Sequence, residues 1–276
     1  MNVSPNSIAT MKDAVRTMLA GVEPEPQTRP ATTAIGWAYA HAVLGRTAEA
    51  QRVLDNWTAA LADDPRPNRV CDSAGQTRPI YAFFAAACRT KTQRLLGLSV
   101  ERSNAPAGDA PGPAAALWRA HELLASGAPW SRVESDVERL WHAALARQRL
   151  TPADGSVGNL HPLDAETCLD AFVFDELCAL HAGFLAALAA PEPAGPIYPR
   201  GSRLQRMRRV ALYHVANTQP DNTTNQPWGL AAFAYWPETR DFAVQQLHDT
   251  RTWLAAHPGP APGLIAGLLA DVLAFG

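Results

Sequence analysis

The chain has 276 residues, enough for one large domain with a substantial buried core. Hydrophobic residues make up 47% of it and charged residues 18%, below the roughly 25% charged share typical of soluble domains. The formal net charge of −2 gives no reason to expect a nucleic acid or an anionic membrane as a partner. No apolar run reaches the ~20 residues needed to span a bilayer, so we expect no membrane span.

The N-terminal sequence and the cysteines favour a reducing compartment. The first residues lack the basic segment and continuous apolar stretch of a secretory signal. The spacing of Cys71, Cys88, Cys168 and Cys178 contains no CxxC pair and does not suggest a secreted disulfide framework. We therefore expect a cytoplasmic protein, and the sequence gives no motif for a metal or another cofactor.

Apolar residues recur at helical spacing through almost the whole chain, beginning with Ile8, Met11, Val15 and Met18. A helical hairpin follows, and Gly45 at its turn can adopt the left-handed conformation that ends many helices. No segment shows convincing period-two alternation, so we predict an all-α protein. The predicted helices after the first cover 35–44, 48–61, 79–96, 113–126, 130–149, 163–189, 202–217, 227–235, 239–256 and 262–275.

Six predicted helices follow a polar stretch that ends in proline. Proline is well placed in the first turn of a helix because its missing N–H has no helical partner there. Two helices with their turns take about 35–50 residues, which is within the range of helical repeats. The six prolines are Pro30, Pro79, Pro113, Pro162, Pro227 and Pro262.

Ten to twelve paired helices fit two architectures. In a closed α/α toroid, inner helices surround an axis and outer helices cover them; an open α-solenoid stacks the pairs in a row. Open solenoids usually repeat units of uniform length, whereas the units here vary. We therefore predict an α/α toroid, with the open α-solenoid as the alternative. We assign one domain over 1–276, in which 1–24 holds an N-terminal helix outside the ring.

The segment after Pro162 carries more carboxylates than a helix start requires. Asp164 and Glu166 fall in the first predicted turn, where negative side chains complement the helix dipole. Asp170 and Asp175 lie farther along among apolar residues, where carboxylates are rarely buried unless they are paired or functional. If this helix lines the axis, the four are candidate catalytic residues that act as general acid and base. The alternative is a salt bridge from Asp170 or Asp175 to an arginine of a neighbouring helix.

The polar stretch before Pro227 leads directly into aromatic residues. Amides beside aromatic rings suit a sugar or another polar, ring-shaped ligand, although the same residues can simply build turns. Arg29 and Arg78 each precede a proline and would favour an anion if the helix starts converge, or else pair with carboxylates of adjacent loops. The predicted substrate-binding residues are His161, Arg29, Arg78, Asn217, Asp221, Asn222, Asn225 and Trp228.

Two further groups of side chains have helical spacing and a simpler structural explanation. Cys178 and His181 could both touch a metal, but the sequence supplies no further ligands, so core packing is the better interpretation. Arg203, Arg206 and Arg209 predict a basic helix face exposed to solvent.

Paired helices with polar–proline starts and a carboxylate-bearing inner helix resemble the α/α-toroid proteins over most of residues 25–276. These include the terpene-cyclase and protein-prenyltransferase β-like folds and the six-hairpin glycosidases. The Asp-x-Asp-Asp acid of class II terpene cyclases has its nearest counterpart in 164–167, which departs from it at two positions, and the Asp-x-Cys zinc element of prenyltransferases is absent. Hairpin-ring glycosidases often use separated carboxylates beside aromatic residues, which this chain also offers.

We therefore expect a protein that binds or transforms a small molecule in an acidic cavity lined by amides and aromatic rings. The resemblance implies a saccharide or a terpenoid as substrate and carboxylate acid/base chemistry. The alternative is a non-catalytic helical scaffold that binds a ligand or a protein partner. The sequence does not decide whether the protein is an enzyme.

Overall fold

The computed structural model describes residues 7–24, 33–62, 70, 79–100, 112–134, 169–190, 200–217 and 226–275. Within these ranges the regular elements are all helices, which confirms the predicted all-α class. One isolated bridge joins Pro24 to Ala261 in the described residues. In the same ranges, no helix has both the length and the apolar character that crossing a membrane requires.

The helices agree closely with those predicted from the apolar pattern. Their bounds differ from the predicted ones by at most three residues, except that the helix predicted over 163–189 is described from Leu169. The helix predicted over 130–149 is described as a short 3-10 turn, and the rest of that range lies outside the described residues. Gly45 has the expected positive φ, 75°.

The elements are α1 (Ile8–Gly21), α2 (Ile35–Val43), α3 (Thr47–Ala62), α4 (Pro79–Leu95), α5 (Gly112–Ala125), η2 (Trp130–Arg132), α7 (Leu169–Ala189), α8 (Arg200–Asn217), α9 (Leu230–Tyr235), η5 (Pro237–Thr239), α10 (Arg240–Ala256) and α11 (Gly263–Ala274).

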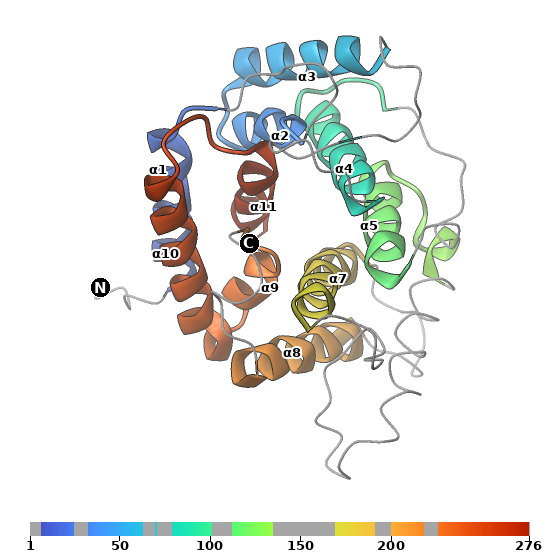
Figure 1. The fold of residues 1–276 in the computed structure, drawn as a ribbon. Helices are drawn as coiled ribbons and strands as arrows, with labels where there is room; N and C mark the ends of the chain where they lie inside the picture. Colours follow the sequence, from blue (N-terminus) through green and yellow to red (C-terminus); the bar gives the residue numbers. More distant parts are fainter. Residues whose placement is uncertain are drawn as a thin grey trace.

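An inner layer of helices lies around the middle of the molecule (Figure 1). In chain order they are α2, α4, α5, α7, α9 and α11, and each packs against the next, while α11 also packs against α2. We call these the inner helices. Outside them, α3 packs on α2, α8 on α7, α10 on α9 and α1 on α11. Each inner helix follows or begins with one of the six prolines, so the proline pattern marks this inner layer.

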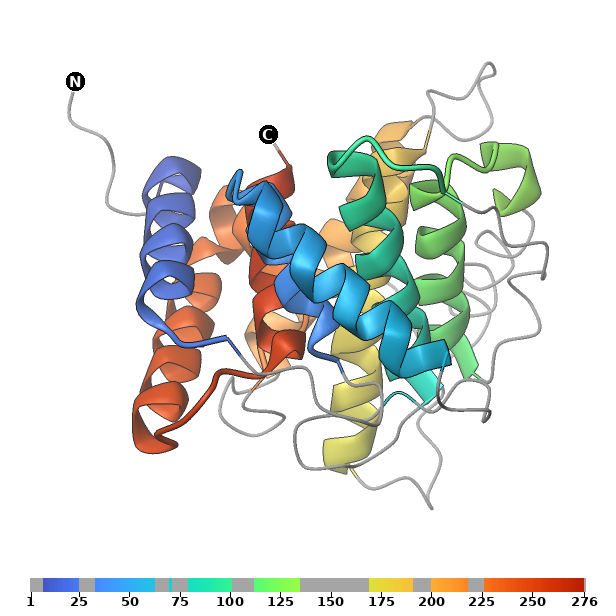
Figure 2. The ribbon, with the colours of Figure 1, turned by 90° about the horizontal axis from the view of Figure 1, so that it is seen from above.

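The inner helices α7 and α11 run in the same direction. His181 of α7 hydrogen-bonds Asp271 of α11, and one turn later Phe184 packs against Phe275 with ring centroids 5.7 Å apart. Contacts that advance together along both helices require a parallel arrangement. Figure 2 shows α4 beside them with the same orientation, so the N-terminal ends of these helices lie on one side of the molecule.

The first and last inner helices come closest where two glycines face each other. A Cβ placed on Gly36 would lie 1.8 Å from the carbonyl oxygen of Gly263, so the backbones of α2 and α11 are in direct contact. Next to this contact, the indole N–H of Trp37 donates to the carbonyl of Ala261 at 2.8 Å. A side chain at either glycine would therefore force α2 and α11 apart.

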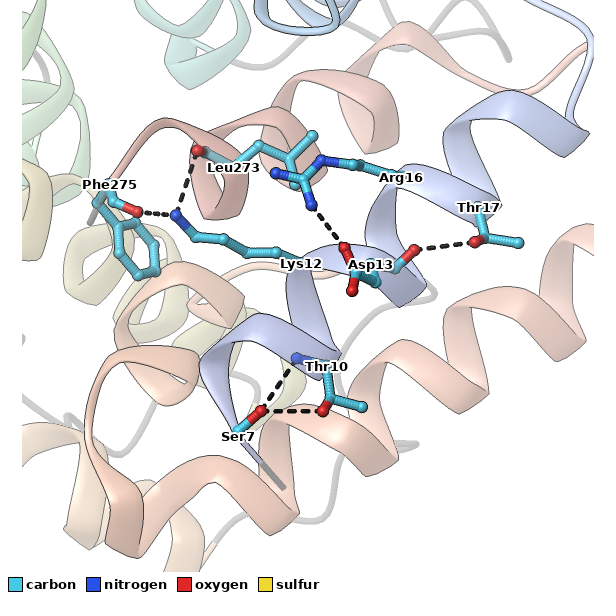
Figure 3. A network of polar contacts seen from close by, with 8 residues as sticks. All are labelled: Ser7, Thr10, Lys12, Asp13, Arg16, Thr17, Leu273 and Phe275. Atoms are coloured by element: carbon cyan, nitrogen blue, oxygen red, sulfur yellow. Dashed lines mark hydrogen bonds and ion pairs between the residues drawn. The ribbon is translucent and has the colours of Figure 1, made fainter. Parts of the chain in front are cut away.

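Helix α1 is fastened to the C-terminal end of α11 by Lys12 (Figure 3). The Lys12 ammonium donates to the carbonyl of Phe275 and, at 3.4 Å, to that of Leu273. A helix leaves its last carbonyls without helical partners, and a cation there also complements the helix dipole. At the N-terminus of α1, the Ser7 side chain caps the helix by accepting a hydrogen bond from the Thr10 N–H at 3.1 Å.

Replacing Gly36 by alanine should lower the free energy of unfolding by about 3 kcal/mol or more, because the new Cβ meets backbone that cannot rotate away. Gly21→Ala is the matched control, since a Cβ at this helical glycine has nothing within 4 Å and should change stability by less than about 1 kcal/mol. Urea denaturation of both variants measures the difference. Equal stability of the two variants would contradict the close approach of α2 and α11.

Candidate functional site

Asp271 is the one charged residue of the otherwise apolar helix α11, and its side chain is only 2% exposed. Its Oδ1 accepts a hydrogen bond from the Lys91 ammonium at 2.6 Å and another from the Tyr39 hydroxyl at 3.0 Å. Its Oδ2 accepts from Nε2 of His181 at 3.2 Å. A buried carboxylate needs this degree of pairing, because an unpaired buried charge is strongly destabilising.

His181 links Asp271 to the start of α9. The backbone N–H of Gly229 donates to Nδ1 of His181 at 3.1 Å, so the ring hydrogen is on Nε2, which donates to Asp271. Gly229 has φ 78°, a conformation that favours glycine, and a Cβ there would lie 2.8 Å from the Phe233 ring. The imidazole also stacks on Trp118, with centroids 5.7 Å apart. The local backbone and the packing together fix the orientation of this ring.

A second histidine, His121 of α5, lies in the same region without such partners. Its side chain packs edge-on against Trp118 at 5.8 Å, and the residue is 7% exposed. Both ring nitrogens of His121 and the indole nitrogen of Trp118 are buried and have no hydrogen-bond partner among the described residues. Each such atom costs about 1–3 kcal/mol, so three of them together call for an explanation by function.

Five inner helices therefore contribute a side chain, and the residue before α9 a backbone N–H, to one largely buried polar group. We call this group the central cluster. Its members are Tyr39 of α2, Lys91 of α4, His121 of α5, His181 of α7, Gly229 at the start of α9 and Asp271 of α11.

Burial and the neighbouring charges set the protonation states of the central cluster. Burial by itself would raise the pKa of Asp271, but Lys91 and His181 outweigh it and hold that pKa well below its usual range. Burial lowers the pKa of His121 to about 3, with Lys91 adding to the effect. Burial also lowers the pKa of His181, although its hydrogen bond to Asp271 opposes this. At pH 7 the protein thus holds an ionised Asp271 beside two neutral imidazoles.

These pKa directions imply acid lability. An unfolded histidine binds a proton near pH 6.5, whereas the buried His121 does so only near pH 3. Below about pH 6.5 the unfolded state therefore binds more protons than the folded state, and the free energy of unfolding falls as the pH drops. Asp271 acts in the same direction at lower pH. Its carboxylate binds a proton near pH 3.8 in the unfolded state but stays ionised to lower pH in the folded state, so the unfolded state again binds more protons.

Two further titratable groups of this region stay protonated at pH 7. Burial raises the pKa of the Cys88 thiol to about 12, and burial together with Asp271 raises the pKa of Tyr39. Cys88 is therefore a poor nucleophile, because the thiolate is the reactive form. The Lys91 ammonium lies 4.1 Å from the centroid of the Tyr39 ring. The Lys91 side chain is 11% exposed, the largest exposed fraction in the cluster.

Trp228 is the predicted site residue whose side chain the structure describes. It is fully buried, its indole N–H donates to Oε1 of Gln226 at 2.9 Å, and its ring lies edge-on to His181 at 6.3 Å. Its ring also packs against Trp118 at 5.8 Å. Trp228 thus forms part of the aromatic wall around the central cluster, and its predicted role in substrate binding stays a prediction.

The other predicted site residues are not described in side-chain detail. The backbones of Asp170 and Asp175 are in α7 and that of Asn217 is in α8, but the positions of these side chains are outside the description. The remaining predicted residues lie outside the described ranges: His161, Asp164, Glu166, Arg29, Arg78, Asp221, Asn222 and Asn225.

The sequence analysis missed Tyr39, Lys91, His121 and Asp271. Asp271 carried a usable signal, because it is the same kind of isolated carboxylate in an apolar helix that drew attention to Asp170. For the other three no signal distinguishes them in the sequence from ordinary helix residues.

The metal interpretation of Cys178 and His181 finds no support in the described ranges. Both residues are buried, and both ring nitrogens of His181 are engaged, one by Gly229 and one by Asp271. No group of three or more His, Cys, Asp and Glu residues in these ranges is arranged to hold a metal ion.

The predicted solvent-exposed face of α8 is wrong at two of its three arginines. Arg203 and Arg206 are buried, while Arg209 is exposed. The reason is that α8 packs on α7, where the buried carboxylate of Glu176 attracts Arg206. The guanidinium of Arg203 lies 4.6 Å from the centroid of the Trp130 ring. Charge pairing and cation–π contact thus turn this face inward.

No protein-family model matches the sequence, and neither the curated proteins nor the solved structures contain a match to it. The function is therefore inferred from the geometry of the central cluster.

Asp271→Asn should lower the free energy of unfolding by about 3–5 kcal/mol, because it leaves the Lys91 ammonium without its buried counter-charge. Asp13→Asn is the control. Asp13 pairs with Arg16 at the same 2.6 Å distance, but its side chain is 74% exposed, so the loss should be below about 1 kcal/mol. Chemical denaturation at neutral pH measures both variants. A loss for Asp271→Asn no larger than that of the control would show that the pair does not stabilise the core.

Proposed function

We propose that the chain is an α/α toroid that binds a small polar molecule at its central cluster. The toroid is supported by the order of the inner helices, each of which packs on the next while the last packs on the first. The backbone contact between Gly36 and Gly263 is expected in a ring and not in an open α-solenoid, where the first and last helices lie far apart. This supports the likeness to α/α-toroid proteins as an architecture.

The unpartnered imidazole of His121 is the observation that carries the proposal of a ligand site. A protein interior without a function would be more stable with an apolar residue in this position, because unpaired buried polar atoms are costly. Polar groups that do not satisfy one another are expected where a ligand satisfies them. The low exposure of Lys91 and His121 implies that a bound molecule would be largely enclosed.

The chemistry of the cluster suits a polar ligand better than a hydrocarbon. A terpenoid would leave the nitrogens of His121 and Trp118 unpaired, whereas a saccharide or another oxygen-rich molecule can satisfy them. If the protein is an enzyme, His121 is proposed to orient the substrate through hydrogen bonds and not to accept a proton, because a pKa of about 3 makes its imidazole a weak base at pH 7. Asp271 would position Lys91 and His181. The four carboxylates at 164–175 stay predicted acid/base residues.

One observation favours the alternative of a non-catalytic scaffold. Asp271, Lys91, Tyr39 and His181 satisfy one another and join α2, α4, α7 and α11. A ring that needs only a structural centre could use this network without binding any small molecule.

A ligand site at His121 should be detectable by NMR. We expect at least one of glucose, glucuronate, malonate, inorganic phosphate and farnesol to shift the ring ¹⁵N signals of His121 and to raise the thermal unfolding midpoint. His121→Phe should abolish both effects. His41→Phe should retain them, because His41 is another buried histidine with an unbonded ring nitrogen but belongs to the α2–α3 side, away from the cluster.

The scaffold alternative predicts a different outcome. None of the five probes would shift the His121 signals in the folded protein, or a probe that raised the midpoint would do so equally in His121→Phe. Either result would contradict a ligand site at the central cluster.

A further inference from the structure

The unsatisfied groups around His121 are mainly hydrogen-bond donors. A lysine ammonium has three N–H donors, and in the described part of the chain that of Lys91 has one hydrogen-bond acceptor, Oδ1 of Asp271. The indole nitrogen of Trp118 can only donate, and it is buried without an acceptor among the described residues. A neutral imidazole adds one donor and one acceptor at His121. The donors therefore outnumber the acceptors that remain.

The carboxylate of the cluster cannot correct this imbalance. Both oxygens of Asp271 are already engaged, Oδ1 by Lys91 and Tyr39 and Oδ2 by His181. What the site lacks is therefore an oxygen-rich group that accepts several hydrogen bonds at once.

Helix α4 packs on the helix of His121 and carries positive charge only. The sequence of α4 has Arg89, Lys91 and Arg94 in its second half and no acidic residue anywhere. On α5, Glu122 is paired with Arg119, so it offers no net negative charge to the site. Helix α7 also packs on α5 and carries three acidic residues and no lysine or arginine, so the attraction for an anion depends on the Lys91 ammonium itself and not on a net charge of the helices.

We propose that the central cluster binds a small organic anion, whose carboxylate or phosphate oxygens accept hydrogen bonds from Lys91, His121 and Trp118. The proposal rests on the proposed function, because it names the class of molecule that the same site takes. Hydrogen bonds from a cationic donor to an anionic oxygen are short and strong, which makes Lys91 the main anchor. His121 and Trp118 are then the groups that distinguish an acid from a neutral analogue of the same shape.

Matched pairs of probes test this class directly. Isothermal titration calorimetry compares glucuronate with glucose and malonate with malonamide, with inorganic phosphate as the third anion, in a buffer of low chloride. We expect at least one anion to bind, and each acid that binds to do so about tenfold or more tightly than its neutral analogue. Comparing the affinities of glucuronate and malonate with that of inorganic phosphate shows whether the site prefers a carboxylate or a phosphate group.

Variants locate the contacts. His121→Gln and Trp118→Phe should each weaken the anion about tenfold, and Lys91→Gln should weaken it more, because it removes the charged donor. His41→Gln should leave the affinity unchanged. If Lys91→Gln does not fold, Trp118→Phe still tests the site, since it removes a single N–H and keeps an aromatic ring.

The outcomes separate this inference from the proposed function. Binding of glucose or malonamide as tightly as their acids, with loss in His121→Gln, would overturn the anion class and leave the ligand site standing. Anion binding that is unchanged in all three cluster variants would overturn the assignment to this cluster. If none of the five compounds titrated by calorimetry bound, the anion proposal would be overturned. If farnesol also left the His121 signals unshifted, the proposed function would fail with it.

Discussion

The buried carboxylate of Asp271 is the constraint on which the centre of the molecule depends. A carboxylate that is 2% exposed must be paired, and its three donors come from three different inner helices. The requirement therefore fixes α2, α4 and α7 around α11, and His181 extends it to the start of α9 through the Gly229 N–H. One charge on a short apolar helix thus determines how five segments distant in sequence are arranged.

Satisfying Asp271 leaves a different imbalance on the α5 side of the cluster. Lys91, Tyr39 and His181 occupy both oxygens of Asp271, and the nitrogens of His121 and Trp118 have no hydrogen-bond partner among the described residues. Natural proteins usually satisfy their buried polar atoms, and the exceptions concentrate where they bind or react with something. The structural centre and the proposed ligand site are therefore two sides of one polar cluster, joined by Lys91.

The sequence predicted the helices well because local signals define them. Apolar spacing placed α2, α4 and α11 within a residue at each end, and prolines marked the helices that became the inner layer. Of the side chains around the candidate site, Trp228 is the one that was predicted as a site residue, and its role in binding stays a prediction. Lys91, His121 and Asp271 meet through packing across 180 residues of chain, which no local pattern encodes. The buried Arg203 and Arg206 were misassigned for the same reason, since only the contact with α7 shows which side of α8 is covered.

Asp271 holds His181 as a neutral imidazole with its hydrogen on Nε2, beside a neutral His121. The decisive measurement is a set of long-range ¹H–¹⁵N NMR spectra of the imidazole rings, recorded between about pH 8 and pH 5. We expect a protonated Nε2 and an unprotonated Nδ1 for His181 at neutral pH, and no titration of the His121 ring over this range. A doubly protonated His181 or His121 near pH 7, or a His181 with its hydrogen on Nδ1, would contradict this arrangement.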